Sequence, residues 1–539
     1  MKSAPAPAGQ VQRPEGYERR WWVLAVLCLS LLVIGIDNTI LNVALPTLSR
    51  TLHATNSQLQ WIVDAYVLVF ASLLLTTGSL SDRFGRRSAL AGGLVIFGVG
   101  SVASAFAGTA NVLTATRALM GIGGALIMPS TLSILTNVFP PEERGRAIGI
   151  WAGVSGLGIA IGPVVGGALL GHFWWGSVFL VNVPVVVIGL IAGRIIVPNT
   201  KDPSSPKVDP AGATLSVLGL VTLVYGIIEV PSYGWGNGRI LLAFALAAVV
   251  LGAFVAWELH TDHPMLKIQF FRNPRFSAAS IGVMLVFFAL FGSFFFVTQE
   301  LQFILGYTPL QAGLRLAPIA LVMALAAPTA GRLVEKIGNK AMVSMGMGLT
   351  ALGLAYLGTT TAGSGYGHIF TSLLFLGVGI GFAIAPATES IMGSLPVEKA
   401  GVGSAMNDTT RQVGGALGVA ILGSVFSSAY IAGLAPALRS MPVLAAKAAG
   451  QSVGVALAQA QRLGGAAGQA LAAAAKTSFV HAMDRALFVG AGFALVGGLI
   501  VLFWLPNRAA PPAGDPLPGV IDEAPDEEPE GEMDVAVAH

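Results

Sequence analysis

The chain has 539 residues, of which 54% are hydrophobic and only 11% are charged, and its mean hydropathy is +0.75. Water-soluble domains carry about 25% charged residues, so this composition excludes an ordinary soluble enzyme or binding module. The net charge of +3 indicates no nucleic-acid surface, and the single cysteine, Cys28, excludes a disulfide framework or a thiolate metal cluster.

Apolar stretches long enough to cross a bilayer, at about 20 residues each, recur along the whole chain. The first is too long for the core of a signal peptide, so we expect it to be retained as an anchor. We therefore predict an all-α polytopic membrane protein with fourteen transmembrane helices. The predicted spans begin near Trp21, Gln60, Ser88, Val112, Ala147, Val178, Ala211, Ile240, Phe276, Gln311, Ala341, His368, Gly401 and Arg485.

The distribution of Lys and Arg predicts the orientation of these spans. With an even span count, 20 of the 30 basic residues fall on the side that holds both chain ends, and eight fall on the other side. Basic loops stay in the cytoplasm, so we predict a bacterial inner-membrane protein with both termini cytoplasmic. The basic residues on the terminal side include Arg19, Arg20, Arg83, Arg86, Arg87, Arg144, Arg146, Lys201, Lys207, Lys267, Arg332, Lys336 and Lys340.

The first two predicted spans carry acidic residues within apolar sequence. Asp37 lies 16 residues beyond Trp21, which places it about 24 Å along a helix, in the outer half of its span. An ionised carboxylate at membrane depth costs about 2.5–3.5 kcal/mol, so one that persists is expected to be paired, hydrated or functional. Asp64, near the outer end of span two, is either a residue that attracts cations or a carboxylate hydrated at the surface.

A short loop motif after span two occurs twice. Its first copy is Gly78, Leu80, Asp82, Arg83, Gly85, Arg86 and Arg87, and its degenerate second copy is Gly331, Leu333, Glu335, Lys336, Gly338 and Lys340. The copies are eight predicted helices apart, so two helices are inserted between two six-helix repeats. We expect a tail at 1–20, a bundle at 21–197, two inserted helices with linkers at 198–276, a second bundle at 277–506 and a disordered acidic tail at 507–539.

Spans four and five add a buried base and a glycine pattern. Arg117 enters span four from the outside at a depth similar to that of Asp37, so the two can meet. We interpret Asp37 as a proton-binding carboxylate whose charged form is held by Arg117, or the two residues as a static neutralising pair. Gly158, Gly162 and Gly166 share one helix face through their four-residue spacing, where a neighbouring backbone can approach closely.

The later spans hold fewer candidates. Asp408 and Arg411 are three residues apart and can neutralise each other on one helix face, although Asp408 can also be a second proton or cation site. Glu389, between Thr388 and Ser390, is a candidate that attracts substrate from the cytoplasm. The outer loop 430–485 contains stretches such as 443–475 that can lie as a helix on the membrane surface. Aromatic residues at suitable places for substrate contact are Trp61, Tyr66, Phe288, Phe291, Phe294, Phe295 and Phe296.

Over residues 20–506 these motifs resemble the fourteen-spanner drug:proton antiporter family of the major facilitator superfamily. The likeness includes the loop motif at 78–87. Met120 stands where the family usually has Gln, and residues 174–177 replace an aromatic-Arg-aromatic cluster. The other matching residues are Asp37, Asn38, Thr39, Asn42, Ala44, Leu45 and Pro46 in span one, Leu113, Arg117, Gly121, Gly123 and Ala125 in span four, and Gly158, Gly162, Pro163, Gly166 and Gly167 in span five.

The resemblance implies roles for two of the motifs. Asp82 and Arg83 are expected to form a charge relay that clasps the two bundles on the cytoplasmic face and releases them when the cavity turns inward. The alternative is that the basic residues of this loop only fix topology. The glycine pattern of span five is expected to seal the path against proton leakage, beyond the generic helix packing that its spacing alone indicates.

We therefore expect a proton-coupled exporter of hydrophobic or cationic drugs by alternating access, monomeric, embedded in the lipid bilayer, and without cofactor, metal or nucleic acid. No G-x-x-x-x-G-K-[ST] loop for ATP occurs. One proton crossing 100 mV supplies about 2.3 kcal/mol, enough to drive export. A dedicated exporter of one metabolite, such as an antibiotic, siderophore or lipid, stays open as an alternative. A membrane enzyme is disfavoured because H-E-x-x-H and G-x-S-x-G patterns have no usable setting, and a sensor because no signalling domain is evident.

Overall fold

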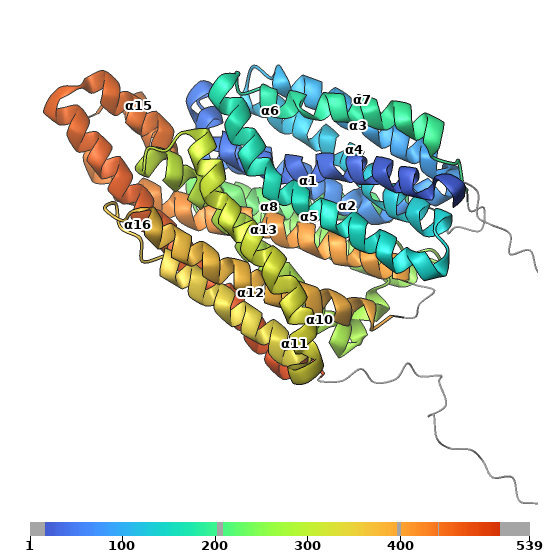
Figure 1. The fold of residues 1–539 in the computed structure, drawn as a ribbon. Helices are drawn as coiled ribbons and strands as arrows, with labels where there is room; N and C mark the ends of the chain where they lie inside the picture. Colours follow the sequence, from blue (N-terminus) through green and yellow to red (C-terminus); the bar gives the residue numbers. More distant parts are fainter. Residues whose placement is uncertain (1–16, 202–207, 396–399, 440, 507–539) are drawn as a thin grey trace, which may run out of the picture.

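The computed structural model describes residues 17–201, 208–395, 400–439 and 441–506, and all the regular elements within these ranges are helices (Figure 1). Twelve helices of this described part are long and apolar enough to cross a membrane. The predicted all-α class is confirmed. The predicted acidic tail at 507–539 and Lys207 lie outside the described residues.

The first helices, which we call the N-half, follow a short turn η1 (Tyr17–Arg19). They are α1 (Arg20–Thr51), α2 (Asn56–Phe84), α3 (Arg86–Ala105), α4 (Ala110–Val138), α5 (Pro141–His172), α6 (Ser177–Leu180) and α7 (Asn182–Ile196). Next come the inserted helices α8 (Pro210–Tyr233) and α9 (Gly238–His260), then η2 (Ile268–Arg272). The remaining elements, the C-half, are α10 (Pro274–Gln299), η3 (Glu300–Ile304), α11 (Pro309–Leu357), α12 (Tyr366–Met392), α13 (Ala400–Leu438), α14 (Val443–Gln451), α15 (Val453–Leu463) and α16 (Gly465–Trp504).

Two local features repeat between the halves and support an internal duplication. Helices α2 and α11 both begin with a capping box, in which a Thr side chain and a Gln side chain satisfy each other's backbone N–H groups. The repeated loops both turn at a glycine with positive φ, 115° at Gly85 and 83° at Gly338. A left-handed backbone of this kind is strained for residues with a Cβ.

The number of spans depends on two of these helices. The 49-residue helix α11 contains non-helical backbone at Gly338, so it is two helices joined at the predicted boundary between spans ten and eleven. Helix α5 has 32 residues and is long enough to cross a membrane, but it is not among the twelve because only the shorter segment Ile161–His172 counts as apolar. The total of fourteen spans stays a prediction.

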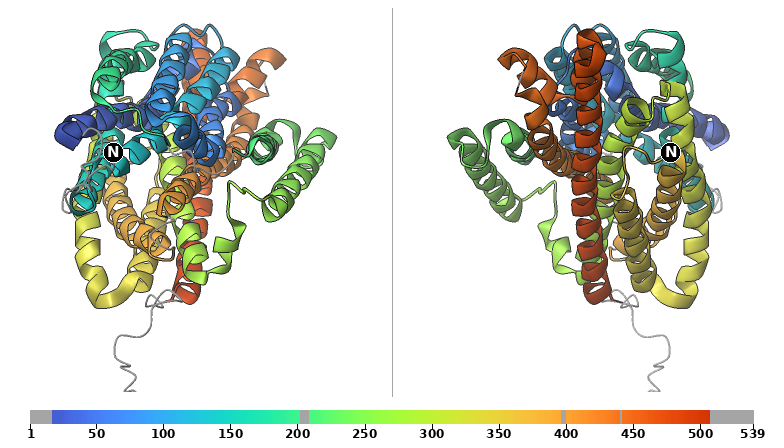
Figure 2. Two further views of the ribbon diagram at one scale, coloured as in Figure 1. Left: turned by 90° about the vertical axis from the view of Figure 1, so that its right-hand side faces the viewer. Right: turned by 90° about the vertical axis from the view of Figure 1, so that its left-hand side faces the viewer.

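The two halves meet along two seams. Helix α2 packs on α13, and α5 packs on α11. We call the side where α1 begins and α16 ends the terminal side, and the opposite side, where α1 ends and α2 begins, the far side. The inserted helix α8 packs on both α2 and α13, while α9 packs on α8 and stands out from the side of the bundle (Figure 2).

The long loop after α13 folds back onto the far side of the protein. Helix α14 packs on α15, and α15 turns back at Gly464 to form a hairpin with the first turns of α16, while it also packs on α1. The hydroxyl groups of Ser49 on α1 and Ser452 at the start of α15 lie 2.6 Å apart in a hydrogen bond. The loop is helical as expected, but α15 packs against protein. Helix α16 starts at Gly465 instead of near Arg485, because its first turns belong to this hairpin packing.

Candidate functional site

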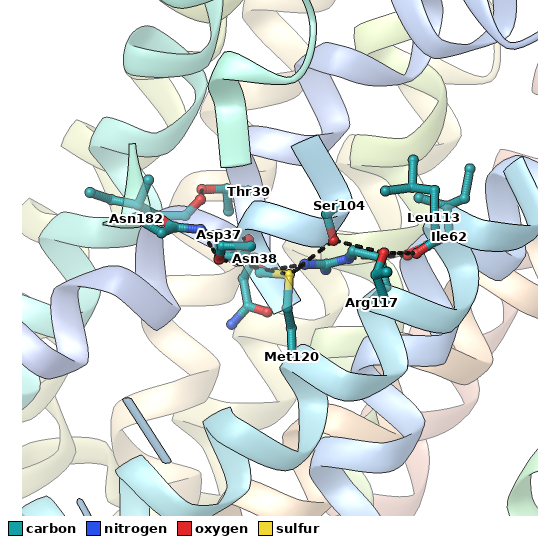
Figure 3. Close-up of polar contacts among 12 residues, drawn as sticks. Asp37, Asn38, Thr39, Ile62, Ser104, Leu113, Arg117, Met120 and Asn182 are labelled. Atoms are coloured by element: carbon teal, nitrogen blue, oxygen red, sulfur yellow. Dashed lines mark hydrogen bonds and ion pairs between the residues drawn. The ribbon is translucent and has the colours of Figure 1, made fainter. Parts of the chain in front are cut away.

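A buried ion pair lies in the middle of the N-half. Arg117 on α4 donates through Nη1 to Oδ2 of Asp37 on α1 at 2.5 Å, and the two side chains are 2% and 0% exposed. Arg117 also donates through Nε to the carbonyl oxygen of Ile62 at 3.3 Å, and its guanidinium lies 4.3 Å from the ring centre of Tyr66. The pair therefore ties α1, α2 and α4 together (Figure 3).

Asn182 completes the coordination of this pair, and sequence reasoning did not single it out. Its Nδ2 donates to Oδ1 of Asp37 at 3.3 Å and to the hydroxyl of Ser101 at 3.3 Å. Figure 3 shows Asn182 on the opposite side of Asp37 from Arg117. Both carboxylate oxygens of Asp37 are thus hydrogen-bonded, Oδ2 to Arg117 and Oδ1 to Asn182. An amide side chain at the start of a strongly apolar span was the available signal.

Met120 occupies the position where the related family usually carries Gln. Its sulfur lies 3.5 Å from the hydroxyl of Ser104 and 3.8 Å from Nη1 of Arg117. A thioether is only a weak hydrogen-bond acceptor, so it contributes little to holding the guanidinium. Asp37 is consequently the dominant partner of Arg117.

Asp64 lies beside this pair without a partner of its own. Its side chain is 0% exposed, and both carboxylate oxygens lack a hydrogen-bond partner among the described residues. The alternative prediction, that Asp64 is hydrated at the surface, is therefore wrong for this conformation. A buried carboxylate without a partner is costly, so Asp64 is suited to receive a cation or a proton.

A small cavity at the seam between the halves contains Asp64 and Arg117. Its volume of about 10 Å³ is close to the minimum that holds one water molecule, so the space between the halves is closed at this level. The N-half contributes α1, α2 and α4, and the C-half contributes α10 and α13. The lining residues are Asn38, Leu41, Asn42, Val63, Asp64, Val67, Arg117, Phe291, Gly415 and Val419.

The other predicted substrate contacts do not line this cavity, and among the aromatic candidates only Phe291 does. Tyr66 is fully buried, stacked on Phe70 and beneath Arg117. Trp61 is half-buried, with its ring 6.4 Å from that of Tyr225 on α8. Glu389 is exposed on α12.

The loop motif at 78–87 makes its contacts within the N-half. Oδ1 of Asp82 accepts from Nε of Arg86 at 2.7 Å and from the hydroxyl of Ser133 at 2.6 Å. The expected partner Arg83 is exposed instead, beside the ring of Phe84. Arg87 donates to the carbonyl oxygen of Val197, and a Cβ on Gly78 would contact Pro129. The clasp between the halves stays a prediction.

The glycine pattern of α5 has two distinct faces. Gly158, Gly162 and Gly166 lie against the backbone of α1, so close that an added Cβ would contact residues 35–40. The shared face predicted from their spacing is therefore confirmed, with α1 as the neighbour. Gly167 instead abuts Pro309 and Leu310 on α11, and Pro163 abuts Gly313 of the same helix. This second face forms the α5–α11 seam on the far side.

Asp408 and Arg411 form an ion pair on α13, as their spacing predicts. Nη1 of Arg411 lies 3.6 Å from Oδ1 of Asp408, and Nη2 donates to the hydroxyl of Thr388 on α12 at 3.1 Å. The arrangement favours a structural pair that links α13 to α12. Neither residue lines the cavity beside Asp64.

Residues 27–419 match the family model of the Major Facilitator Superfamily. The chain is 34% identical over 496 residues to the tetracenomycin C resistance and export protein of Streptomyces glaucescens, covering 90% of this chain and 91% of that protein. It is 34% identical over 490 residues to the multidrug efflux pump LfrA of Mycolicibacterium smegmatis, covering 90% and 96%. It is also 34% identical to the methyl viologen resistance protein SmvA of Salmonella typhimurium, covering 87% and 95%.

Solved structures share the fold at much lower identity. A bacterial homologue of the human lysosomal transporter Spinster, in an inward-facing and occupied conformation, aligns with a TM-score of 0.63 and 19% identity, covering 91% of this chain and 99% of that one. The xylose transporter XylE of E. coli aligns with a TM-score of 0.57 and 15% identity, covering 91% of this chain and 98% of that one.

Proposed function

Because the chain belongs to the major facilitator superfamily, we propose that it is a secondary active exporter that moves hydrophobic or cationic organic compounds out of the cytoplasm in exchange for protons. One observation carries this proposal. A fully buried ion pair, Asp37 with Arg117, lies beside the unpaired carboxylate of Asp64, and Arg117 and Asp64 line the same cavity between the halves. The names of the relatives, which are resistance, export and efflux proteins, support the direction of transport.

The arrangement supplies a mechanism for exchange. When Asp37 is ionised, it holds Arg117, and Asp64 is available to a cationic substrate. When Asp37 takes a proton, its attraction for the guanidinium falls, and Arg117 can turn to Asp64, the carboxylate in the same cavity. Proton and cationic substrate then compete through one arginine, so that binding of the first favours release of the second.

The membrane topology of the proposal extends the described helices. We propose fourteen spans in the bacterial inner membrane with both termini cytoplasmic and a monomer as the working unit. The break at Gly338 within α11 and the 32-residue length of α5 support the count. The terminal side is then cytoplasmic and the far side external, as the excess of Lys and Arg on the terminal side indicates.

The test of proton coupling is gradient-driven ethidium transport in energised vesicles that contain the Asp37→Asn variant. We expect gradient-driven transport to fall at least about tenfold, because the amide keeps the shape of the side chain but cannot bind or release a proton. Ethidium binding should weaken as well, since Arg117 is then free to turn to Asp64. Asp262→Asn, which neutralises an exposed carboxylate between α9 and η2, is the control and should transport normally. Full gradient-driven transport in Asp37→Asn would place the proton site elsewhere.

The role of Asp64 is tested by the charge of the substrate. In Asp64→Asn we expect the affinity for ethidium to fall about tenfold, a loss of about 1.4 kcal/mol, while a neutral apolar compound binds as in the wild type. Equilibrium binding to purified protein measures both. An equal loss for the two compounds would indicate a packing defect.

Transport of one natural product but of no cationic dye would favour the dedicated exporter, the alternative that the name of the Streptomyces relative supports.

A further inference from the structure

A second buried carboxylate lies in the C-half, away from the cavity at the seam. Glu300 is 1% exposed, and its Oε2 has no hydrogen-bond partner among the described residues. By residue count Glu300 lies close to the end of a span, which predicts that it is hydrated at the membrane surface. This prediction is wrong, because the side chain is buried. The packing of η3 against α10, α11 and α16 covers the side chain instead.

Asp484 lies on α16, which packs on η3, and its carboxylate acts electrostatically on that of Glu300. Oδ1 of Asp484 is buried and also lacks a partner among the described residues, while Oδ2 lies 3.9 Å from Nδ1 of His481. The side chain of His481 is 75% exposed, and that of Asp484 is 17% exposed. His481, Asp484 and Glu300 thus form a series of titratable groups that runs from the far-side surface into the C-half.

The remaining charged groups near this series have other contacts. Arg50 on α1 lies over the ring of Phe303, and Arg315 on α11 lies over the ring of Tyr307. Arg485 on α16 lines a separate cavity together with residues of α8 and α13. Lys476 also lies on α16, five residues before His481. Helix α10 has no ionisable group near its far-side end. Within the described residues, no cation forms an ion pair with Glu300.

Glu300 begins an element that closes the far side. It is the first residue of η3, a π-helical turn, and such turns occur often at functional sites. Two residues further, Nε2 of Gln302 donates to the carbonyl oxygen of Val43 on α1 at 2.9 Å. Phe303 contacts Arg50 of α1 and lies against Gly454 of the far-side hairpin. A movement of η3 would therefore break contacts between the two halves.

We propose that Glu300, Asp484 and His481 form a proton-binding site that takes protons from the far-side solution and controls closure of the far side. Two neighbouring carboxylates, here one buried and one partly buried, repel each other when both are ionised, and a shared proton removes this repulsion. The protonated site therefore stabilises η3 in its observed contacts with α16 and α1. Loss of the proton favours hydration of Glu300, for which η3 has to leave these contacts, and the far side opens.

The inference rests on the proposed exchange of substrate for protons and assigns the entry site for the proton. Its test measures the far side directly, without substrate. Spin labels are attached to cysteines introduced at the exposed positions Thr51 on α1 and Thr361 in the C-half, with Cys28 replaced by Ala, in the full chain reconstituted into liposomes. Pulsed electron paramagnetic resonance then gives the distance between the labels across about pH 5.5–8.5, where His and perturbed carboxylates titrate.

In the wild type we expect the ratio of long to short distances to rise at least about tenfold with increasing pH, about 1.4 kcal/mol. Glu300→Gln, which is permanently neutral, should keep the short distance at every pH. Glu300→Asp should retain a pH response, and Asp262→Asn should behave as the wild type. A wild-type distance independent of pH, or a full response in Glu300→Gln, would overturn the assignment.

Substrate-driven proton movement in the same liposomes, reported by a pH-sensitive dye, separates this inference from the proposed function. Wild-type protein that shows no such movement contradicts proton-coupled export itself. Intact movement in the wild type, together with a distance response that survives Glu300→Gln, contradicts only the role of Glu300. Asp37→Asn should lose the dye signal but keep the pH response of the distance.

Discussion

Replacing Arg117 by Met is expected to destabilise the protein by about 3–5 kcal/mol and to abolish transport, because the change leaves the carboxylate of Asp37 buried without its cation. The pair is 2% and 0% exposed, so water cannot take over the role of the guanidinium. Among the described residues, only Asn182 would still be bonded to Asp37, through one hydrogen bond of 3.3 Å. Removing the partner of a buried charge is much more costly than replacing the whole pair.

Thermal unfolding in detergent, followed by tryptophan fluorescence, measures the loss of stability. The double variant Asp37→Asn, Arg117→Met should recover most of the stability, because it removes both charges, but it should recover no transport. Arg411→Met is the matched control, since its pair with Asp408 is more exposed, at 28% and 11%, and 3.6 Å long, and it should cost clearly less than Arg117→Met. Equal losses for the two single variants would show that burial does not distinguish these pairs.

Replacing Gly313 by Ala is expected to hold the far side open and to lower transport about tenfold or more. A Cβ at Gly313 would contact the backbone carbonyl of Pro163 across the α5–α11 seam, and a backbone group cannot turn away as a flexible side chain can. Overpacking a close contact costs about 1–3 kcal/mol, which here falls only on the closed arrangement.

The distance between labels at Thr51 and Thr361 checks this expectation, together with ethidium transport. Gly348→Ala is the control on the same helix, because a Cβ there meets nothing within 4 Å. It should leave both the distance and transport unchanged. A Gly313→Ala protein with the wild-type distance would mean that α5 and α11 separate too little for one methyl group to matter.

Local sequence signals predicted a large share of the fold and part of the site. Counting residues from the start of each span placed Asp37 and Arg117 at the same depth, and the structure brings them together. The four-residue glycine spacing in α5 correctly indicated a close helix contact, and the repeated loop correctly placed the break at Gly338. Each of these signals depends on helix geometry alone, with 1.5 Å of rise per residue.

The features that sequence reasoning missed depend on contacts between distant segments. Residue counting placed Asp64 and Glu300 near span ends, but α13 and α16 cover them, and nothing in their own helices shows this. The bond from Asn182 to Asp37 joins residues 145 positions apart. The resemblance implied a charge relay of Asp82 with Arg83, but Asp82 pairs with Arg86 across the turn at Gly85, a contact that residue spacing along one helix does not give.

The inserted helix α8 has a consequence for the movement of the halves. Because it packs on both α2 and α13, it holds that seam together on its outer side. A rotation of one rigid body against another displaces atoms in proportion to their distance from the axis, so with the axis near α8 the largest displacement falls at α5 and α11. We therefore expect bulky molecules to leave the central path beside α5 and α11, where the opening is widest.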